Sequence, residues 1–302
     1  MFDIKQFGDW FDKWGPQQKV FGIGDIHGRW QTIRNFWNKY NQETELYIHK
    51  KHNVLVLMGD AGLNYFFNYR DQETKKKMSQ IPLTYFIVRG NHEERPSICM
   101  EKNPTEWHTE EFWGNTVYVE NNYPNIKYAL DEAAIYHIPY ITGYCDGTPE
   151  WDYYDEGMPF WDTYEVLVIP GAYSVDKYHR LSNGWSWFEN EQLSPQEREK
   201  CLRLIEEVRN VDLVLSHTCP IIFEPTDLFL SFIDQSMVDK SMERLLGEVE
   251  YRLNYKAWIW GHYHAFRDYP RADGRKKLML YDNCAIDILE YLEEEEFKKY
   301  EL

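Results

Sequence analysis

The sequence predicts a layered α/β fold, because short apolar runs alternate with helical stretches along the chain. Five apolar runs each end in Gly or Ser and are followed at once by Asp, Asn or His. Runs that are apolar along their whole length are typical of strands buried on both faces, as in sheets covered by helices. The predicted strands span residues 20–24, 54–59, 85–90, 213–216 and 257–261.

Helical stretches lie between and after these strands. The third of them has the clearest start, because Ser194 precedes a proline and Glu197 stands where a capping box needs an acidic residue. Alternating strands and helices place functional residues at the strand ends. The predicted helices span residues 30–40, 70–80, 194–210 and 237–254.

We expect one domain over residues 1–302, with its core at about 18–290, because no repeat or long linker divides the sequence. Residues 144–165 hold seven acids, seven aromatics and no Lys or Arg. One interpretation is a simple surface insertion. The other is a functional segment, which either forms a wall or lid that repels polyanions or binds a partner through its aromatic residues. The acidic tail, residues 289–302, carries an EEEE run, and we expect a solvated helix or frayed end without function.

The composition limits the partners of the protein. Its 302 residues include 33 Lys and Arg and 50 Asp and Glu, so the net charge is −17, which disfavours binding to duplex nucleic acid. The apolar runs are too short to span a membrane, and the first residues lack the apolar stretch of a signal peptide. We therefore expect a cytoplasmic protein without a membrane partner. Five scattered cysteines without a CxxC pair predict no disulfide framework.

Five short clusters at the predicted strand ends carry the residues suited to chemistry. Carboxylate, amide and imidazole groups together form the mixed ligand set that suits Fe, Zn or Mn. Two such ions about 3.5–4 Å apart can stabilise both the attacking and the leaving oxygen of a phosphoryl group. The clusters are GDIHG at 24–28, GD at 59–60, GNHE at 90–93, SH at 216–217 and GHYH at 261–264.

These five clusters, in this order from about residue 20 to 284, resemble the pattern of the calcineurin-like metallophosphoesterase superfamily. The resemblance implies a four-layer α/β/β/α sandwich and an enzyme that hydrolyses phosphate esters. It also implies two divalent metal ions as cofactors, with Mn²⁺ expected in vitro and Fe, Zn or a mixed pair as alternatives. The implied nucleophile is a metal-bound hydroxide, and no covalent enzyme intermediate is needed.

The resemblance also implies a role for each residue of the clusters. His92, next to the asparagine ligand, is the implied catalytic group that protonates the leaving oxygen or stabilises the transition state. The implied ligands of one metal are Asp25, His27 and His264, those of the second are Asn91, His217 and His262, and Asp60 bridges the two.

The sequence departs from the protein-phosphatase branch at its second motif. That branch reads GDxVDRG, whereas this chain has Leu63 in place of the Asp and Asn64 in place of the phosphate-binding Arg, which leaves Asn64 as a candidate substrate contact. Residues 169–194 resemble a stretch found in a bacterial and phage-type branch of the superfamily. There Lys177 or Arg180 is a candidate to replace the missing phosphate contact; the alternative is a structural turn with a surface salt bridge.

The predicted function is the metal-dependent hydrolysis of a small phosphorylated substrate, with no protein partner assigned. Two other classes of enzyme remain as alternatives. The first is a nuclease or nucleotide phosphodiesterase, and the second is a protein Ser/Thr phosphatase. The missing Arg weakens the last of these and predicts poor turnover of phosphopeptides beside measurable diesterase activity. A non-catalytic scaffold of the same fold is a more remote alternative, because degenerate members lose metal ligands and this chain retains them all.

Overall fold

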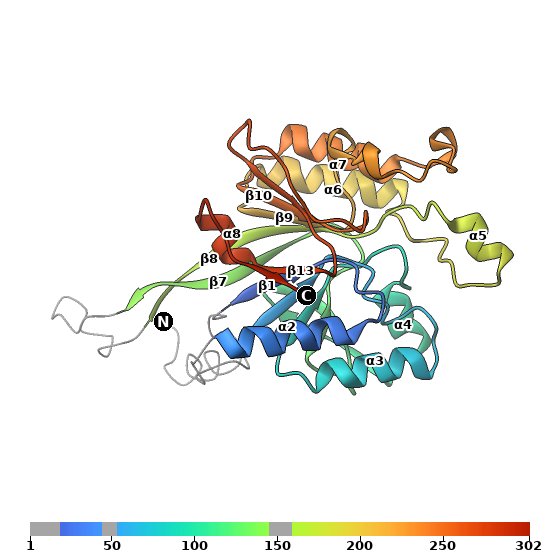
Figure 1. Cartoon of the computed structure of the whole chain (residues 1–302), viewed down its shortest axis with the longest axis horizontal. Helices are drawn as coiled ribbons and strands as arrows, with labels where there is room; N and C mark the ends of the chain where they lie inside the picture. Colours follow the sequence, from blue (N-terminus) through green and yellow to red (C-terminus); the bar gives the residue numbers. More distant parts are fainter. Residues whose placement is uncertain (1–18, 44–52, 145–158) are drawn as a thin grey trace.

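The computed structural model describes residues 19–43, 53–144 and 159–302, which form two β-sheets and the helices that cover them (Figure 1). The first sheet has the strand order β14-β13-β1-β2-β3-β6-β5-β4, and the second has the order β11-β12-β10-β9-β8-β7. The strands are β1 Val20–Ile23, β2 Val54–Leu57, β3 Thr84–Ile87, β4 Trp107–Phe112, β5 Asn115–Glu120, β6 Ile126–Tyr128, β7 Ala134–Tyr144, β8 Pro159–Ile169, β9 Leu213–Ser216, β10 Ala257–Trp260, β11 Arg267–Asp268, β12 Lys276–Met279, β13 Cys284–Asp287 and β14 Lys299–Glu301.

The helices within residues 30–102 cover the outer face of the first sheet and those within residues 195–252 cover the outer face of the second, so the molecule has the predicted four layers of helix, sheet, sheet and helix (Figure 1). The α-helices are α2 Trp30–Glu43, α3 Tyr69–Ser79, α4 Pro96–Lys102, α5 Lys177–Ser182, α6 Pro195–Val208, α7 Ser241–Arg252 and α8 Ile288–Glu293. Three short 3₁₀ turns, η3 Ile221–Phe223, η4 Thr226–Leu228 and η5 Gln235–Met237, precede α7.

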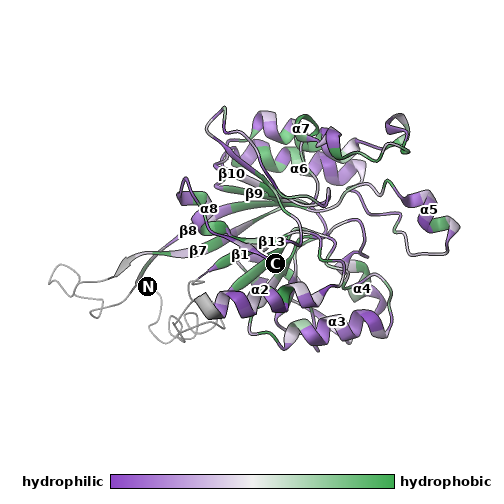
Figure 2. Cartoon of the chain, viewed as in Figure 1, coloured by the Kyte–Doolittle hydropathy of each residue, from purple (hydrophilic) through white to green (hydrophobic). Residues whose placement is uncertain are grey.

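The alternation of side chains along each strand explains the layers. In β2, Val54 and Val56 point into the core between the sheets, together with Leu213 and Leu215 of β9. The intervening β2 side chains join a second core under α2, and the other face of β9 joins a third core under α6 and α7. Figure 2 shows the hydrophobic residues along the strands, while the outer helices α2 and α3 are largely hydrophilic.

The five predicted strands and four predicted helices are all present, with small shifts at their ends. The predicted capping box at α6 is confirmed: Ser194 Oγ accepts from Glu197 N at 3.2 Å, and Glu197 Oε2 accepts from Ser194 N at 2.7 Å. The fourth helix begins later than predicted, at Ser241 rather than at residue 237. Asp239 accepts a hydrogen bond from the Ser241 N–H there, which leaves residues 235–237 in a separate turn.

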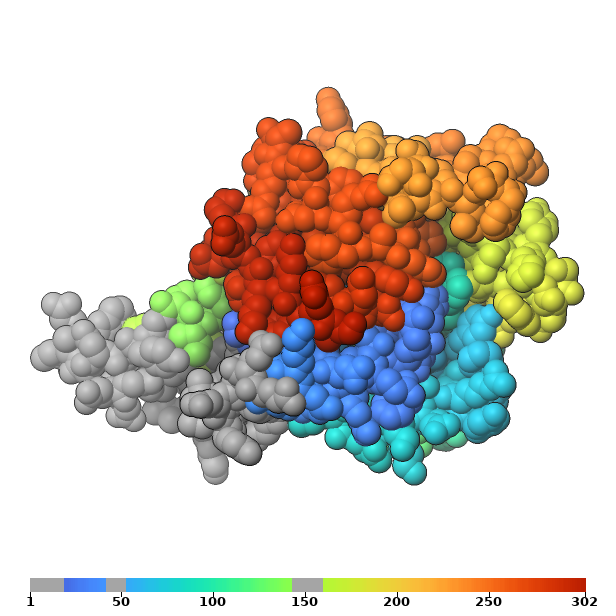
Figure 3. Space-filling model, in the orientation of Figure 1, coloured from blue at the N-terminus to red at the C-terminus, as the bar shows by residue number. Residues whose placement is uncertain are grey.

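The expectation of a solvated or frayed tail at residues 289–302 is wrong. Helix α8 buries Ile288, Tyr291 and Leu292, and β14 pairs with β13 at the edge of the first sheet. Tyr300 is buried and packs edge-on against Phe21 of β1. In Figure 3 these residues, dark red, lie against the blue surface of the N-terminal part. Apolar residues precede and follow the run of glutamates, and these residues bury the segment.

The acidic and aromatic segment at 144–165 belongs in part to a long hairpin. Residues 145–158 lie outside the described residues, but Tyr144 ends β7, and β8 begins at Pro159. β8 runs parallel to β9, and its far end, Ile169, pairs with Ser216. Ten residues of strand span about 33 Å. The end of β7 at Tyr144 and the start of β8 at Pro159 therefore lie far from the loops that follow Ile169 and Ser216 (Figure 1).

Within the described residues, no helix combines the length and the apolar character that crossing a membrane requires. The four cysteines of this part of the chain, at positions 99, 201, 219 and 284, are free thiols.

Candidate metal centre

The five predicted clusters converge at one end of the two sheets. Strands β1, β2 and β3 are parallel neighbours in the first sheet, and β9 and β10 are parallel neighbours in the second. The carboxyl ends of parallel strands meet at one sheet edge, so the loops that follow them lie together. The predicted metal ligands and His92 all follow these strand ends.

The backbone in these loops is strained. His27, Asp60, His262 and His264 have positive φ angles of 45°, 44°, 71° and 51°, a conformation that costs a non-glycine residue about 1 kcal/mol or more. Hydrogen bonds between the loops stabilise it: His27 N donates to Asp60 O at 2.8 Å, and His262 N donates to the Asp25 carboxylate at 2.8 Å. The fold thus holds these side chains in fixed positions.

Glycines at the strand ends allow the loops to approach closely. A Cβ atom on Gly59, which also has a φ of +94°, would lie 2.0 Å from His217 Nδ1. A Cβ atom on Gly90 would lie 2.1 Å from Asp60 Oδ1. Any larger residue would therefore displace a predicted ligand, which explains why these motifs contain glycine.

Asp25, His27 and His264 form the first group of candidate ligands. One ligand atom of each lies within 4.8 Å of the others, and His27 Nε2 is 3.0 Å from His264 Nε2. Neighbouring nitrogen ligands about 2.1 Å from an ion lie about 3 Å apart. Tyr281 stacks on the His264 ring, with centroids 5.2 Å apart. These three residues therefore fit a divalent metal ion.

Asn91 and His217 face each other in the second group. His217 Nδ1 donates to Met58 O at 2.7 Å, which leaves Nε2 to face Asn91 Oδ1 at 2.9 Å. The Asn91 amide nitrogen donates elsewhere, so its oxygen is the atom that faces the ring. His262 packs edge-on against His217, with ring centroids 5.0 Å apart. An acceptor oxygen and a ring nitrogen at this separation also fit neighbouring ligands of one ion.

Asp60 lies between the two groups. Its Oδ1 is 3.5 Å from His217 Nε2, whereas its Oδ2 is 4.0 Å from His27 Nε2. One carboxylate thus turns an oxygen toward a histidine of each group, which is the arrangement that a bridging ligand needs. The donor set, its burial and these separations fit two divalent ions.

The charges of the site favour a cation there. Although burial acts against it, the positive charge of His92 and His217 holds the pKa of Asp60 well below its usual value. Burial also opposes a charge on His217, but Asp60 and Asp25 raise its pKa to about 9. The carboxylates therefore stabilise positive charge at His217 Nε2, and a divalent ion that binds there replaces a proton. Burial lowers the pKa of His264 to about 4, so this imidazole is neutral at pH 7 and available as a ligand.

His92 lies beside Asp60 and His27, and one ligand atom of each of these three residues lies within 4.8 Å of the others. Its Nε2 is 3.8 Å from Asp60 Oδ2, and its backbone N donates to Asp60 Oδ1 at 2.8 Å. Its ring stacks on Tyr65 and lines a cavity of about 190 Å³ beside His27. Burial and the charge of Arg180 lower the pKa of His92 to about 4, although Asp60 acts to raise it. The side chain faces the space in which a substrate can bind.

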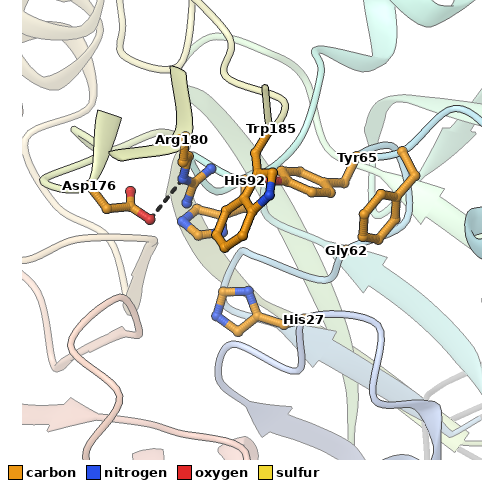
Figure 4. Close-up of a pocket in the computed structure, with 8 residues that line it drawn as sticks. His27, Gly62, Tyr65, His92, Asp176, Arg180 and Trp185 are labelled. Atoms are coloured by element: carbon orange, nitrogen blue, oxygen red, sulfur yellow. Dashed lines mark hydrogen bonds and ion pairs between the residues drawn. The ribbon is translucent and has the colours of Figure 1, made fainter. Parts of the chain in front are cut away.

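Arg180 reaches this cavity, and the other two candidate substrate contacts do not line it. Arg180 is 1% exposed, its Nε donates to Asp176 at 2.8 Å, and both of its terminal nitrogens are buried without a partner (Figure 4). Lys177 instead lies over the ring of Trp187, 3.8 Å from its centroid. Asn64 is 4% exposed, and its backbone oxygen accepts from Glu94 N. The Arg180 guanidinium also lies over the ring of Tyr65, 5.9 Å from its centroid, and its terminal nitrogens have no hydrogen-bond partner.

The family model of the calcineurin-like phosphoesterases matches residues 18–266. The chain belongs to this family. Its members generally hydrolyse phosphoesters with two divalent metal ions. No curated protein sequence matches this phosphoesterase.

Solved structures with a similar arrangement include proteins from two bacteria and a fish. The TT1561 protein of Thermus thermophilus has 10% identity and a TM-score of 0.49, over 93% of this chain and 97% of that one. The phosphopantetheinyl hydrolase PptH of Mycobacterium tuberculosis has 12% identity and a TM-score of 0.41, over 87% and 90%. A dimetal phosphatase of Danio rerio has 10% identity and a TM-score of 0.42, over 90% and 95%.

Two residues orient a candidate ligand of this phosphoesterase in a way that the local sequence does not indicate. Asn91 Nδ2 donates to Ser174 Oγ at 2.8 Å, and Ser174 Oγ donates to Glu191 Oε2 at 2.5 Å. Glu191 also accepts from Ser174 N at 2.9 Å. Ser174 and Glu191 both lie in the stretch at 169–194 that resembles a bacterial and phage-type branch, and nothing in the local sequence indicates that they meet Asn91.

Replacing Ser174 by Ala should weaken metal binding at the site of Asn91 by roughly 10- to 100-fold, the usual effect of removing a group that orients a ligand. The variant leaves the Asn91 amide without its acceptor, so its oxygen no longer faces His217 in a fixed position. Calorimetric titration with Mn²⁺ measures the effect, with the exposed Ser182→Ala as control. Unchanged affinity at both metal sites would show that this contact does not orient the ligand.

Proposed function

We propose that this phosphoesterase hydrolyses small phosphate esters with two divalent metal ions. The observation that carries the proposal is the position of Asp60, whose two oxygens face histidines of the two ligand groups. Two ions held there supply positive charge at the phosphoryl oxygens and activate water as the nucleophile. Asp25, His27 and His264 hold one ion, Asn91, His217 and His262 hold the other, and Asp60 bridges them. All seven predicted ligands lie at one end of the sheets, which favours an enzyme over a scaffold that has lost its ligands.

Arg180 binds the phosphoryl group in this proposal. A buried guanidinium with two free nitrogens presents the planar, charged fork that suits two phosphate oxygens. It lies in the same cavity as His27 and His92, beside the proposed metals (Figure 4). It therefore takes the place of the Arg that Asn64 replaces. Since this contact restores a cation for a doubly charged group, it supports monoester as well as diester substrates.

His92 donates a hydrogen bond or a proton to the leaving oxygen. Its imidazole faces the cavity, and Tyr65 stacks on it at a centroid distance of 6.2 Å, which fixes the ring. Asp60 Oδ2, at 3.8 Å, stabilises the protonated form when it occurs. Mn²⁺ is the proposed ion, because imidazole, amide and carboxylate ligands together suit it.

Replacing Arg180 by Gln should lower kcat/KM for p-nitrophenyl phosphate by about 10- to 100-fold, as expected for losing hydrogen bonds to a charged group. The loss should be smaller for bis-p-nitrophenyl phosphate, which carries one negative charge fewer. Lys177→Gln serves as the matched control and should leave both rates nearly unchanged. Equal losses for the two variants would refute the assignment of Arg180.

The proposal as a whole is tested by assaying the full chain, loaded with Mn²⁺, on small monoesters, small diesters and a phosphothreonine peptide. We expect turnover of the small esters, loss of turnover with a chelator, and slow hydrolysis of the peptide. The last expectation rests on the missing Arg at position 64, and fast hydrolysis of the peptide would instead show that Arg180 fully replaces that Arg. A chain that binds two ions and hydrolyses none of these compounds would contradict the proposed function.

A further inference from the structure

A groove of about 490 Å³ opens from the candidate metal centre, and His92 and Asp176 line both this groove and the cavity that contains Trp185. Tyr173, Val175 and Asp176 line it, together with residues between 224 and 240. Its inner end is formed by five residues of the centre itself: Asp60, Asn91, His92, His262 and His264. The groove is therefore continuous with the place where the phosphoryl group would bind.

The outer part of this groove is apolar. Its lining includes Leu228, Phe229, Leu230, Ile233 and Val238. Two of these residues remain open to solvent, since Leu228 is 39% and Leu230 is 50% exposed. Apolar side chains that line a hollow beside a reaction centre gain free energy when a ligand covers them.

Contacts to the rest of the protein hold the loop that forms this wall. Arg267 donates two hydrogen bonds to the Asp227 carboxylate, at 2.9 and 2.6 Å. Phe229 stacks on Tyr263, with centroids 6.4 Å apart, and Lys240 Nζ lies 4.5 Å from the centroid of the Phe229 ring. The groove is thus formed by the fold before any ligand binds, which lowers the entropic cost of binding.

The charged groups of the groove offer no free cation. Among the described residues that line it, Lys240 is the one Lys or Arg, and it pairs with Glu224 at 2.5 Å. Asp176 pairs with Arg180 at 2.8 Å. Glu243 is 3% exposed and accepts from Thr218 Oγ1, and its second oxygen has no partner. A ligand with a further negative charge would therefore find no unpaired cation among the residues described in this groove.

We propose that this groove binds the organic group of the phosphate ester, and that this group is apolar and carries no charge of its own. The proposal rests on the proposed function and adds the class of substrate to it. It disfavours nucleoside polyphosphates and nucleic acid strands, because each carries further phosphates for which the groove offers no unpaired cation. The metals and Arg180 bind the phosphoryl group, and the loop at 228–238 binds the rest of the molecule.

The test uses three phosphonates that the enzyme cannot hydrolyse: benzylphosphonate, 2-naphthylmethylphosphonate and 3-carboxybenzylphosphonate. Calorimetric titration of the Mn²⁺-loaded full chain should show the naphthyl compound binding roughly tenfold more tightly than the benzyl compound, because it buries a further apolar ring. The carboxybenzyl compound should bind no more tightly than the benzyl compound. Equal affinity for naphthyl and benzyl, or a preference for the carboxylate, would overturn the proposal.

Two adjacent residues give a matched pair of variants. Ile233→Glu places a charge in the groove and should remove most of the naphthyl advantage, whereas Phe232→Glu should retain it, since Phe232 is 78% exposed and does not line the groove. The half-exposed Leu230→Glu repeats the test if Ile233→Glu does not fold. A naphthyl advantage that survives both groove variants would contradict the proposal.

Hydrolysis of phenyl and 2-naphthyl phosphate separates this inference from the proposed function. If wild-type protein hydrolyses both at equal kcat/KM, the function stands and the groove proposal fails. If it hydrolyses neither and binds none of the phosphonates, both fail.

Discussion

Asp60→Asn should lower turnover of any phosphate ester by on the order of 10³-fold or more, because an amide cannot share negative charge between two cations. The metal content should fall below two ions per chain for the same reason. The fold should remain, since an asparagine Oδ1 still accepts the hydrogen bond from His92 N that Asp60 now accepts at 2.8 Å. Metal analysis after gel filtration and a p-nitrophenyl phosphate assay measure both effects.

The control for Asp60→Asn is Asp162→Asn, which changes an exposed carboxylate on β8 in the same way. It should keep two ions and full activity. If Asp60→Asn also kept both ions and normal turnover, Asp60 would not be the bridging ligand.

His92→Ala should keep both metals but slow turnover by roughly 10²–10⁴-fold, the usual contribution of a general acid or base. The leaving oxygen carries most negative charge when its alcohol is a weak acid, and His92 stabilises that charge by an N–H hydrogen bond or a proton. The loss should therefore be greatest for alkyl phosphates and smaller for p-nitrophenyl phosphate. Rates for a series of esters with leaving groups of graded acidity test this expectation.

His108→Ala is the control for His92→Ala, because His108 is an exposed histidine on β4, outside the site. It should leave the rates unchanged. An equal loss for every leaving group in His92→Ala would indicate that His92 positions the substrate or Asp60 and does not act on the leaving oxygen. Loss of a metal ion would indicate that His92 is a ligand.

The five strands that carry the clusters, and the convergence of the polar residues that follow them, could be predicted from the sequence, because each cluster follows a local apolar run. Gly59 and Gly90 belong to the same signal, since their missing side chains make room for His217 and Asp60. The family match and the convergence of these loops confirm the fold and family that the motifs predict. The assignment of each ligand to a metal stays a prediction.

Contacts between distant segments could not be predicted in this way. From the sequence, Lys177 and Arg180 are equally good candidates for the phosphate contact. Only the orientation of the turn at α5 places Arg180 in the cavity and Lys177 over Trp187. Ser174 and Glu191 meet Asn91 across the chain, with nothing in the local sequence to indicate it.

The C-terminal segment shows how charge can mislead an interpretation of local sequence. Its glutamates predict a solvated end, whereas Tyr291 and Tyr300 anchor it in the core and at the sheet edge. The strand pairing of β14 depends on β13, and β13 in turn pairs with β1 at the other end of the chain. Such long-range pairing has no counterpart in the periodicity of the tail.

The most direct test of the proposed metal centre is anomalous diffraction from crystals of the full chain grown with Mn²⁺ and measured on both sides of the manganese absorption edge. We predict two anomalous peaks, one beside His27 and His264 and one beside Asn91 and His217, with the Asp60 carboxylate between them. A single peak at this position, or manganese bound only elsewhere on the protein, would contradict the dinuclear site on which the proposed function rests.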